Sequence, residues 1–349
     1  MRTRSSIVQT AALAVGLTIA SLLGGVAEAA PGGGKIVVAN RASGTISVIS
    51  VKNNAVSTYA LPAGANAPEP MYVFYSPIQR RVFVGDRAND RVVAFDAHSF
   101  DVEGIADAGA GVFHMWGSRA TGELWVNNDL DNTTSVIDMR TLETVATIPT
   151  PADLVAMGGK PHDVIVDQQG FYGYISVIGV AGAGDGLVQV DARDYSVVNR
   201  AVVGDDPHLS LAAGNPNLYV PAQGSDIVEV LDRESLESVA VIPVPGAHGA
   251  GMRVNGRYFY TTNLPDGGDD AIYVIDTKSN SVVGDPVDTP FAVPHNIAMT
   301  PNGRMIYVTH SGGASDKVTV YRTRGRSPIP SLVGSIDVGL NPFGIAYVP

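Results

Sequence analysis

Short runs of Val, Ile, Tyr and Phe recur along the chain in pairs, and a polar turn separates the two runs of each pair. Clear examples are 35-KIVVAN-40 with 45-TISVIS-50, 81-RVFVGD-86 with 91-RVVAFD-96, and 304-RMIYVTH-310 with 317-KVTVYR-322. Further pairs lie at 123–138, 172–191, 217–232 and 257–276, which makes seven. Apolar runs bounded by Gly, Asn, Asp or Pro are typical of antiparallel strands with one or both faces buried. The pattern requires no amphipathic helix.

Two more strand-like runs lie between successive pairs. One ends a unit, as in 142-LETVATIP-149 and 236-LESVAVIP-243, and one begins the next, as in 162-HDVIVD-167 and 295-HNIAMT-300. Seven units of four strands predict an all-β fold, a seven-bladed β-propeller with four-stranded antiparallel blades. The chain starts on the second strand of a unit, at Lys35, and ends on an unpaired first strand at 343–348. We therefore expect the C-terminal strand to pair with the N-terminal strands and close the ring.

A tetrapeptide ends several of the second strands: Tyr307-Val308-Thr309-His310, Tyr260-Thr261-Thr262-Asn263 and Trp125-Val126-Asn127-Asn128. A companion segment, Pro-His-x-Ile-Ala-x-x-Pro-x-Gly, stands at 294–303. With these motifs the chain resembles the YVTN-type seven-bladed β-propeller repeat family over nearly all of its length after the leader. The resemblance implies the fold. It leaves the function open, because such propellers serve as enzymes, ligand binders and surface proteins.

The N-terminus has the pattern of a secretory signal peptide. Arg2 and Arg4 precede an apolar run from about residue 7 to 26, and Ala27-Glu28-Ala29 follows as a small-x-small cleavage motif. The expected organisation is a signal peptide at 1–29 and one propeller domain at 30–349. The alternative, a membrane anchor, is disfavoured because no basic residues follow the run. We expect an exported monomer, periplasmic or extracellular, with no membrane span after cleavage.

Charge and cysteine content exclude several classes of partner and site. Loss of residues 1–29 removes two Arg and one Glu, which moves the formal charge from −11 to −12. No basic cluster of the density that nucleic acid requires is present, so we expect no nucleic-acid partner. The chain contains no cysteine, which excludes disulfides and thiolate ligands. Any metal must therefore be held by nitrogen, oxygen or methionine sulfur.

Five of the seven histidines recur once per blade. They are His114, His162, His208, His248 and His295. Four of them precede a glycine by eight residues, at Gly122, Gly170, Gly256 and Gly303, which predicts that all five are equivalent. The same alignment places Met71 and Phe343 in the two remaining blades. Proline precedes five of the seven positions, so we expect these side chains at the entry of the innermost strands, around one mouth of the central channel. His310, at the end of a second strand, is expected near the same mouth.

Converging imidazoles form a natural site for a divalent transition metal. The candidate ligands are His114, His162, His208, His248, His295, His310 and Met71. All-nitrogen ligation with a possible thioether suits copper or zinc, and the divalent affinity order favours copper. The alternative is that each imidazole serves packing by donating to a backbone carbonyl. Five packed imidazoles are costly, however, because each neutral ring needs a donor and an acceptor, and charged rings repel.

Three classes of function follow. The first is a metal-binding propeller, with a metal-dependent oxidoreductase as its enzymatic form, in an arrangement similar to the copper-bearing His-rich face of nitrous oxide reductases and thiocyanate dehydrogenases. The second is a non-catalytic ligand- or protein-binding surface scaffold. The third is a lyase or hydrolase with histidine as general acid or base. In each case a small-molecule substrate or a protein partner is expected at the channel mouth.

Other candidates are weaker. His98 follows a third strand and is expected to be an exposed turn residue. The loops 129-DLDN-132 and 265-PDGGDD-270 could bind calcium but are interpreted as solvated loops. Lactonase-type propellers hold calcium with Glu, Asn and Asp at the mouth, where this chain has histidines, which argues against that activity.

Overall fold

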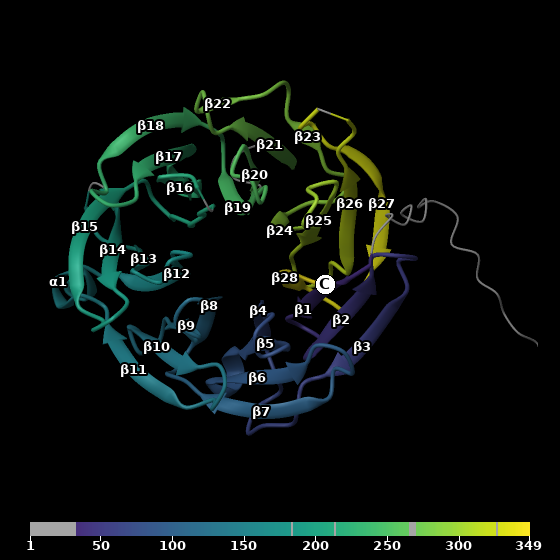
Figure 1. The fold of residues 1–349 in the computed structure, drawn as a ribbon, viewed down its shortest axis with the longest axis horizontal. Helices are drawn as coiled ribbons and strands as arrows, with labels where there is room; N and C mark the ends of the chain where they lie inside the picture. Colours follow the sequence, from purple (N-terminus) through teal and green to yellow (C-terminus); the bar gives the residue numbers. More distant parts are fainter. Residues whose placement is uncertain (1–32, 183, 213, 265–269, 326) are drawn as a thin grey trace, which may run out of the picture.

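The computed structural model describes residues 33–182, 184–212, 214–264, 270–325 and 327–349. The expected leader at 1–29 lies outside them, as does most of the loop 265–270. The described chain forms seven antiparallel sheets arranged as blades around a central axis (Figure 1). This is the seven-bladed β-propeller predicted from the repeat.

Each blade is numbered from its innermost strand outward. Blade 1 consists of β28 (Pro342–Val348), β1 (Lys35–Asn40), β2 (Thr45–Ser50) and β3 (Val56–Ala60). Blade 2 consists of β4 (Pro70–Ser76), β5 (Arg81–Asp86), β6 (Arg91–Asp96) and β7 (Val102–Asp107). Blade 3 consists of β8 (Val112–Gly117), β9 (Glu123–Asn128), β10 (Thr133–Asp138) and β11 (Thr144–Pro149). Blades 4 and 5 consist of β12 (Lys160–Val166), β13 (Tyr172–Ile178), β14 (Asp185–Asp191) and β15 (Val197–Val203); and β16 (Asn217–Ala222), β17 (Ile227–Asp232) and β18 (Ser238–Pro243). Blades 6 and 7 consist of β19 (Ala247–Met252), β20 (Tyr258–Asn263), β21 (Ala271–Asp276), β22 (Ser281–Val282) and β23 (Val287–Asp288); and β24 (Pro294–Met299), β25 (Met305–His310), β26 (Lys317–Arg322) and β27 (Ser331–Asp337).

The helical segments are short. They are η1 (Arg87–Asn89), η2 (Gln223–Ser225) and α1 (Ala152–Ala156), the last of which the apolar pattern did not predict. Within the described ranges no helix is both long and apolar enough to cross a membrane.

The ring closes in blade 1, where the last strand lies against the first. β28 pairs antiparallel with β1, with Val348 opposite Lys35 and Ile345 opposite Val38. The two ends of the chain thus contribute one and three strands to the same blade, in the order that the chain ends predicted.

Apolar side chains fill the spaces between neighbouring blades. Trp125 on β9, for example, packs in one cluster with Ile175 and Val188 of blade 4. A Cβ on Gly173 would lie 2.4 Å from the Trp125 ring, so glycine makes room for the indole there. The outermost strands alternate between exposed and partly buried residues, as expected for a blade with one wet edge.

Blade 5 departs from the regular pattern at its innermost position. Its inner segment joins the sheet only through two isolated bridges, Pro207 with Ala222 and Ser210 with Tyr219. The segment 208-HLSLAA-213 lacks the β-branched residues that fill β12 at Val164, Ile165 and Val166, which explains the weaker strand. His208 therefore sits on the least regular inner segment of the ring.

Candidate metal site in the central channel

Strand pairing shows that the five histidines do not occupy one equivalent position. Pro161 on β12 and Val112 on β8 hold matching places, because they pair with Val177 and Asn128 at the ends of the second strands. His162 directly follows Pro161, whereas Phe113, not His114, follows Val112. By the same criterion His208, His248 and His295 match His162, as do Met71 and Phe343.

The predicted equivalence of His114 is therefore wrong by one residue. The glycine used to set the register lies differently in the two turns. Gly122 comes immediately before Glu123, whose carbonyl accepts the Ser118 N–H, whereas Gly170 comes two residues before Tyr172, whose carbonyl accepts the Asp167 N–H. The turns have equal length, but the residue that takes the positive φ has moved by one place. A one-residue change of register moves a side chain to a different place on the strand.

His114 nevertheless joins the cluster. One ring nitrogen each of His114, His162 and His208 lie within 4.8 Å of one another, which is close enough for the three to hold one metal ion. The Nε2 atoms of His162 and His208 are 3.0 Å apart. His114 and His208 are buried and His162 is partly buried. We refer to these three residues as the histidine triad.

Asp163 orients His114 from the neighbouring blade. Its Oδ1 lies 2.9 Å from Nδ1 of His114, and it also accepts backbone N–H bonds from Leu209 and Val164. Nδ1–H of His114 thus donates to a carboxylate, which leaves Nε2 with a free lone pair. Among the described residues this buried Nε2 has no hydrogen-bond partner. A carboxylate behind a histidine with an open second nitrogen is the arrangement seen around ligated metals.

Burial controls the protonation of these groups. Desolvation holds the pKa of the His114 and His162 imidazoles well below the usual value of 6.5, and the neighbouring His208 lowers both further. Burial also raises the pKa of the Asp163 carboxyl to about 6. At neutral pH His114 and His162 therefore present neutral imidazoles, the form that binds metal.

His248 and His295 form a hydrogen-bonded pair beside the triad, with the His248 ring centroid 3.8 Å from that of His208. Nδ1–H of His248 donates to Oε1 of Gln223 at 2.9 Å, and its Nε2 lies 3.0 Å from Nε2 of His295. The Asn296 amide lies 2.6 Å from Nδ1 of His295 and also donates to the Phe343 carbonyl. The amide N–H therefore meets an acceptor Nδ1, and Nε2–H of His295 donates to His248. These hydrogen bonds satisfy all four ring nitrogens of His248 and His295 without a metal.

Two other predicted ligands lie elsewhere. His310 uses both ring nitrogens in hydrogen bonds, with Nδ1 at 3.1 Å from the Ala292 carbonyl and Nε2 at 2.8 Å from Thr319 Oγ1. Burial lowers its pKa to about 4. Met71, on β4 of blade 2, is fully buried at the strand position that His162 takes in blade 4, and it lies beside the innermost strand of blade 1. The triad does not include either residue.

The weaker candidates also have ordinary surroundings. His98 is an exposed turn residue, as predicted. In the loop 129–132, Asp129 forms an ion pair with Arg87, and Asp131 accepts the Ala110 N–H. Both carboxylates thus have protein partners.

A closed circle of six aromatic side chains surrounds the histidine end of the channel. Its ring centroids follow one another at 3.8 to 6.2 Å through Phe113, His162, His208, His248, His295 and Phe343. On the inner side of this circle lies a cavity of about 120 Å³, lined among others by Tyr72, His114, Asp163, His208 and Asn296. Two of the three triad residues, His114 and His208, therefore border the channel interior.

Sequence reasoning missed Tyr72, Asp163 and Asn296. Each of them occupies the strand position one after the ring position, the place that His114 takes in blade 3. The signal was present in the sequence, because three of these four residues are polar or charged at the entry of buried strands. Only the register could group them.

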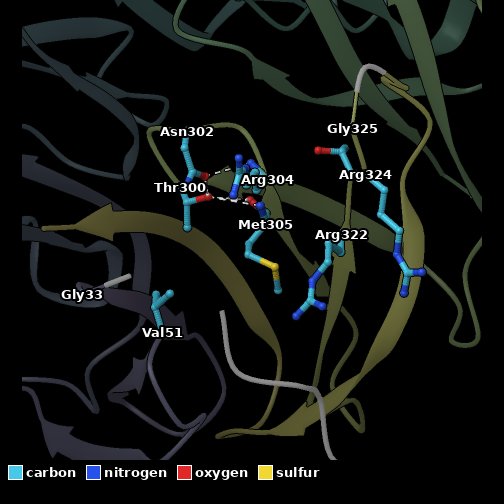
Figure 2. Close-up of a pocket in the computed structure, with 10 residues that line it drawn as sticks. Gly33, Val51, Thr300, Asn302, Arg304, Met305, Arg322, Arg324 and Gly325 are labelled. Carbon is cyan, nitrogen blue, oxygen red and sulfur yellow. Dashed lines mark hydrogen bonds between the residues drawn. The ribbon is translucent and has the colours of Figure 1, made fainter. Parts of the chain in front are cut away.

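A second hollow lies at the opposite face of the ring, near the seam of blade 1. It has a volume of about 410 Å³ and is lined by Gly33, Val51, Arg304, Arg322, Arg324 and neighbouring residues (Figure 2). The turn that carries Arg304 is fixed by Asn302, whose Oδ1 accepts bonds from the Thr300 hydroxyl and the Arg304 N–H. This basic hollow contains no histidine and is distinct from the triad.

The fold and the buried histidines define a seven-bladed propeller with a possible metal site. No protein-family model matches the chain, and no curated protein matches its sequence. Solved structures do share the fold. The periplasmic gluconolactonase PpgL of Pseudomonas aeruginosa is similar with 17% identity and a TM-score of 0.71, over 90% of this chain and 99% of that one.

Two further structures extend the range of activities found on this fold. A putative 6-phosphogluconolactonase of Bacteroides uniformis is 15% identical, with a TM-score of 0.71 over 90% of this chain and 99% of that one. The hydrazine synthase of Kuenenia stuttgartiensis is 16% identical, with a TM-score of 0.68 over 82% of this chain and 91% of that one. Identities this low show the fold alone.

Proposed function

We propose that this protein is an exported propeller that binds a divalent transition metal, with copper preferred, through His114, His162 and His208. The observation that carries the proposal is the buried, unpartnered Nε2 of His114, held in place by Asp163 and aimed at two other imidazoles. A buried acceptor without a partner costs about 1 to 3 kcal/mol, and a metal ion would remove that cost.

The chemistry of the donors supports copper. The three ligands are imidazole nitrogens, which suit copper and zinc, and the divalent affinity order favours copper. In the metal-free protein the Nε2 atoms of His162 and His208 share a hydrogen bond at 3.0 Å, which a bound metal ion would replace. Zinc is therefore the second choice of metal.

The triad leaves coordination positions for a substrate. Three protein ligands with an open position are typical of catalytic rather than structural metal sites. The 120 Å³ cavity beside the triad would admit a molecule of a few heavy atoms, because one water occupies about 30 Å³ of liquid. A metal there would polarise or oxidise a small substrate, which makes a metal-dependent oxidoreductase the favoured enzyme class.

The test is metal-dependent stabilisation. Copper(II) added to chelator-treated protein should raise the melting temperature, because a ligand at roughly 1,000 times its Kd stabilises the folded state by about 4 kcal/mol. His114→Ala, His162→Ala and His208→Ala should each abolish the rise. The controls His98→Ala and His310→Gln should retain it, because neither residue belongs to the triad. Elemental analysis of protein from its export compartment would identify the natural metal.

The two histidine clusters make the test more specific. His248→Ala should leave at least one copper equivalent bound, because the ring nitrogens of His248 and His295 have hydrogen-bond partners without a metal. If no variant of the triad changes the response, or if the wild-type protein shows no copper or zinc response, the metal site would have to be given up in favour of a non-catalytic binding scaffold.

Asp163 should act as a positioning residue for His114. Asp163→Asn keeps the shape but removes the charge that fixes the Nδ1–H tautomer, and losses behind a metal-bound histidine are typically about 10- to 100-fold in affinity. We expect a copper Kd weaker by that factor in a competition titration with a chelator of known affinity. Asp206→Asn is the matched control, because its carboxylate lies 3.7 Å from His162 Nε2, beyond hydrogen-bond distance. Equal affinities for wild type and Asp163→Asn would contradict this role.

A hydrolase is the second candidate. The His114–Asp163 pair also has the geometry of a general base held by a carboxylate, with its free Nε2 beside the cavity. Hydrolysis of a sugar lactone that survives complete metal removal and is lost in His114→Ala would favour it over the metal enzyme.

A further inference from the structure

The channel ends in a wide hollow at the mouth opposite the histidines. Its volume is about 490 Å³, and its lining comes from the C-terminal ends of the innermost strands of blades 2, 3, 4 and 6 together with the inner segment of blade 5. The histidines lie at the beginnings of the same strands. We call this hollow the far-mouth cavity. Its size lies within the range of small-ligand sites, about 300 to 1,000 Å³.

Aromatic side chains form one wall of the far-mouth cavity. Trp116, on β8, is 40% exposed, which is unusual for a tryptophan at the centre of a ring. Phe74, on β4, lies beside it with ring centroids 6.1 Å apart. A Cβ on Gly117 would lie 2.2 Å from the Phe74 ring, so glycine allows the phenyl group to lie flat against β8. The Trp116 ring is thus open for stacking, with the Phe74 ring tilted by 56° beside it.

The charge of the far-mouth cavity is positive in a chain of net charge −11. Arg119 and Arg253 line it, and among the described residues neither forms an ion pair with a carboxylate. Asp167 also lines it, but its carboxylate is buried and accepts the N–H groups of Phe171 and Tyr172. The Arg253 guanidinium lies over the Tyr258 and Tyr260 rings, 5.1 and 5.8 Å from their centroids, at the blade 6 side of the cavity. Arg119 is exposed. An anionic group in the cavity would therefore meet the Arg119 guanidinium, with the charge of Arg253 on the same lining.

We propose that the far-mouth cavity binds a small aromatic anion, with its ring stacked on Trp116 and its anionic group at Arg119. Aromatic stacking and charge pairing each favour such a ligand over a neutral aromatic or an aliphatic anion. Trp116 also lines the 120 Å³ cavity beside His114 and Asp163. The circle of six rings lies at the histidine end of the channel, and a ligand on Trp116 would cover the opposite, open end. The proposal does not depend on the metal.

The two tryptophans allow a direct test. Trp116 is exposed and Trp125 is fully buried, so acrylamide quenching of the fluorescence excited at 295 nm reports on Trp116. The probe is phenylacetate in the presence of chelator, compared with cyclohexylacetate and phenylacetamide. We expect phenylacetate to bind by calorimetry and to protect Trp116 from acrylamide, with at least roughly tenfold weaker binding for each of the other two probes.

Variants locate the site. Trp116→Ala and Arg119→Ala, both at exposed positions, should weaken phenylacetate binding at least roughly tenfold. Arg304→Ala should leave it unchanged, because that residue belongs to the hollow of Figure 2. Binding that is lost in Arg304→Ala and kept in Arg119→Ala would overturn the proposal, as would equal binding of phenylacetamide. An absence of binding up to roughly 10 mM phenylacetate would overturn it too.

Discussion

Removal of residues 342–349 should open the ring and lower the melting temperature by about 10 °C or more, or prevent folding altogether. The deletion takes away β28, which pairs with β1 from Lys35 to Asn40 and buries Phe343 and Val348. Loss of a whole inner strand costs several kcal/mol, which is comparable with the total stability of about 5 to 15 kcal/mol of a typical domain. The β1 edge would lose its pairing partner, and the place of Phe343 in the circle of rings would be empty.

Calorimetry and denaturant unfolding would measure the effect. The matched control is removal of Pro349 alone, since this exposed residue lies beyond β28 and should contribute nothing. A second variant, Ile345→Pro, keeps the chain length but removes the N–H and strains the strand opposite Val38. An unchanged melting temperature after the eight-residue deletion would mean that the observed β28–β1 pairing does not hold the ring closed.

Metal-free protein should lose several kcal/mol of stability as the pH falls from about 6.5 to about 4.5. Burial holds the pKa of His114, His162, His248 and His295 well below the unfolded value of about 6.5, and lowers the pKa of His310 to about 4. In that window the unfolded chain binds protons at these residues and the folded chain does not, so stability decreases as the pH falls. Each such group contributes at most about 1.4 kcal/mol per pH unit.

Other charged groups near the cluster modify this profile without reversing it. Asp163 acts in the opposite direction, because its folded pKa of about 6 lies above the unfolded value and protonation favours the folded state below it. Arg41, near His295, lowers the pKa of that imidazole further. The five histidines together outweigh this one carboxyl.

Unfolding in denaturant at a series of pH values would measure the slope. His162→Asn and His295→Asn should each flatten it, whereas His98→Asn should not, since His98 is exposed. A stability that is constant or increases between pH 6.5 and 4.5 would contradict the burial of neutral imidazoles. Because the pKa values of His114 and His162 are lowered, protons should compete with a metal ion for these two ligands only well below pH 6.5.

The sequence was sufficient for the fold because each feature of it is local and repeated. Alternating Val, Ile and Tyr at one interval predicts strands, seven repeats predict the blade number, and the two chain ends predict the seam. The short α1 and the weak inner segment of blade 5 escaped this reasoning. Neither carries a periodic apolar pattern, and both depend on how neighbouring blades pack.

The site was only partly predictable for physical reasons. The repeat brought the histidines to one end of the channel, but a shift of one residue in the turn glycine hid the true place of His114. Hydrogen bonding then divided the histidines into a triad with an open nitrogen and a self-satisfied pair. That division depends on Asp163, Gln223 and Asn296, whose contacts cross from one blade to the next and cannot be read from any single repeat.

The seam and the triad lie in different parts of the ring, and this separation has a practical consequence. The closing contact is in blade 1, while the triad comes from the consecutive blades 3, 4 and 5. Because Lys35 and Val348 are paired neighbours, a short linker could join the old ends and new ends could be cut between β3 and β4. Such a circular permutant would turn the seam into an ordinary hairpin while the metal ligands keep their neighbours. The chain termini can thus be moved to another blade without changing the neighbours of the histidine triad.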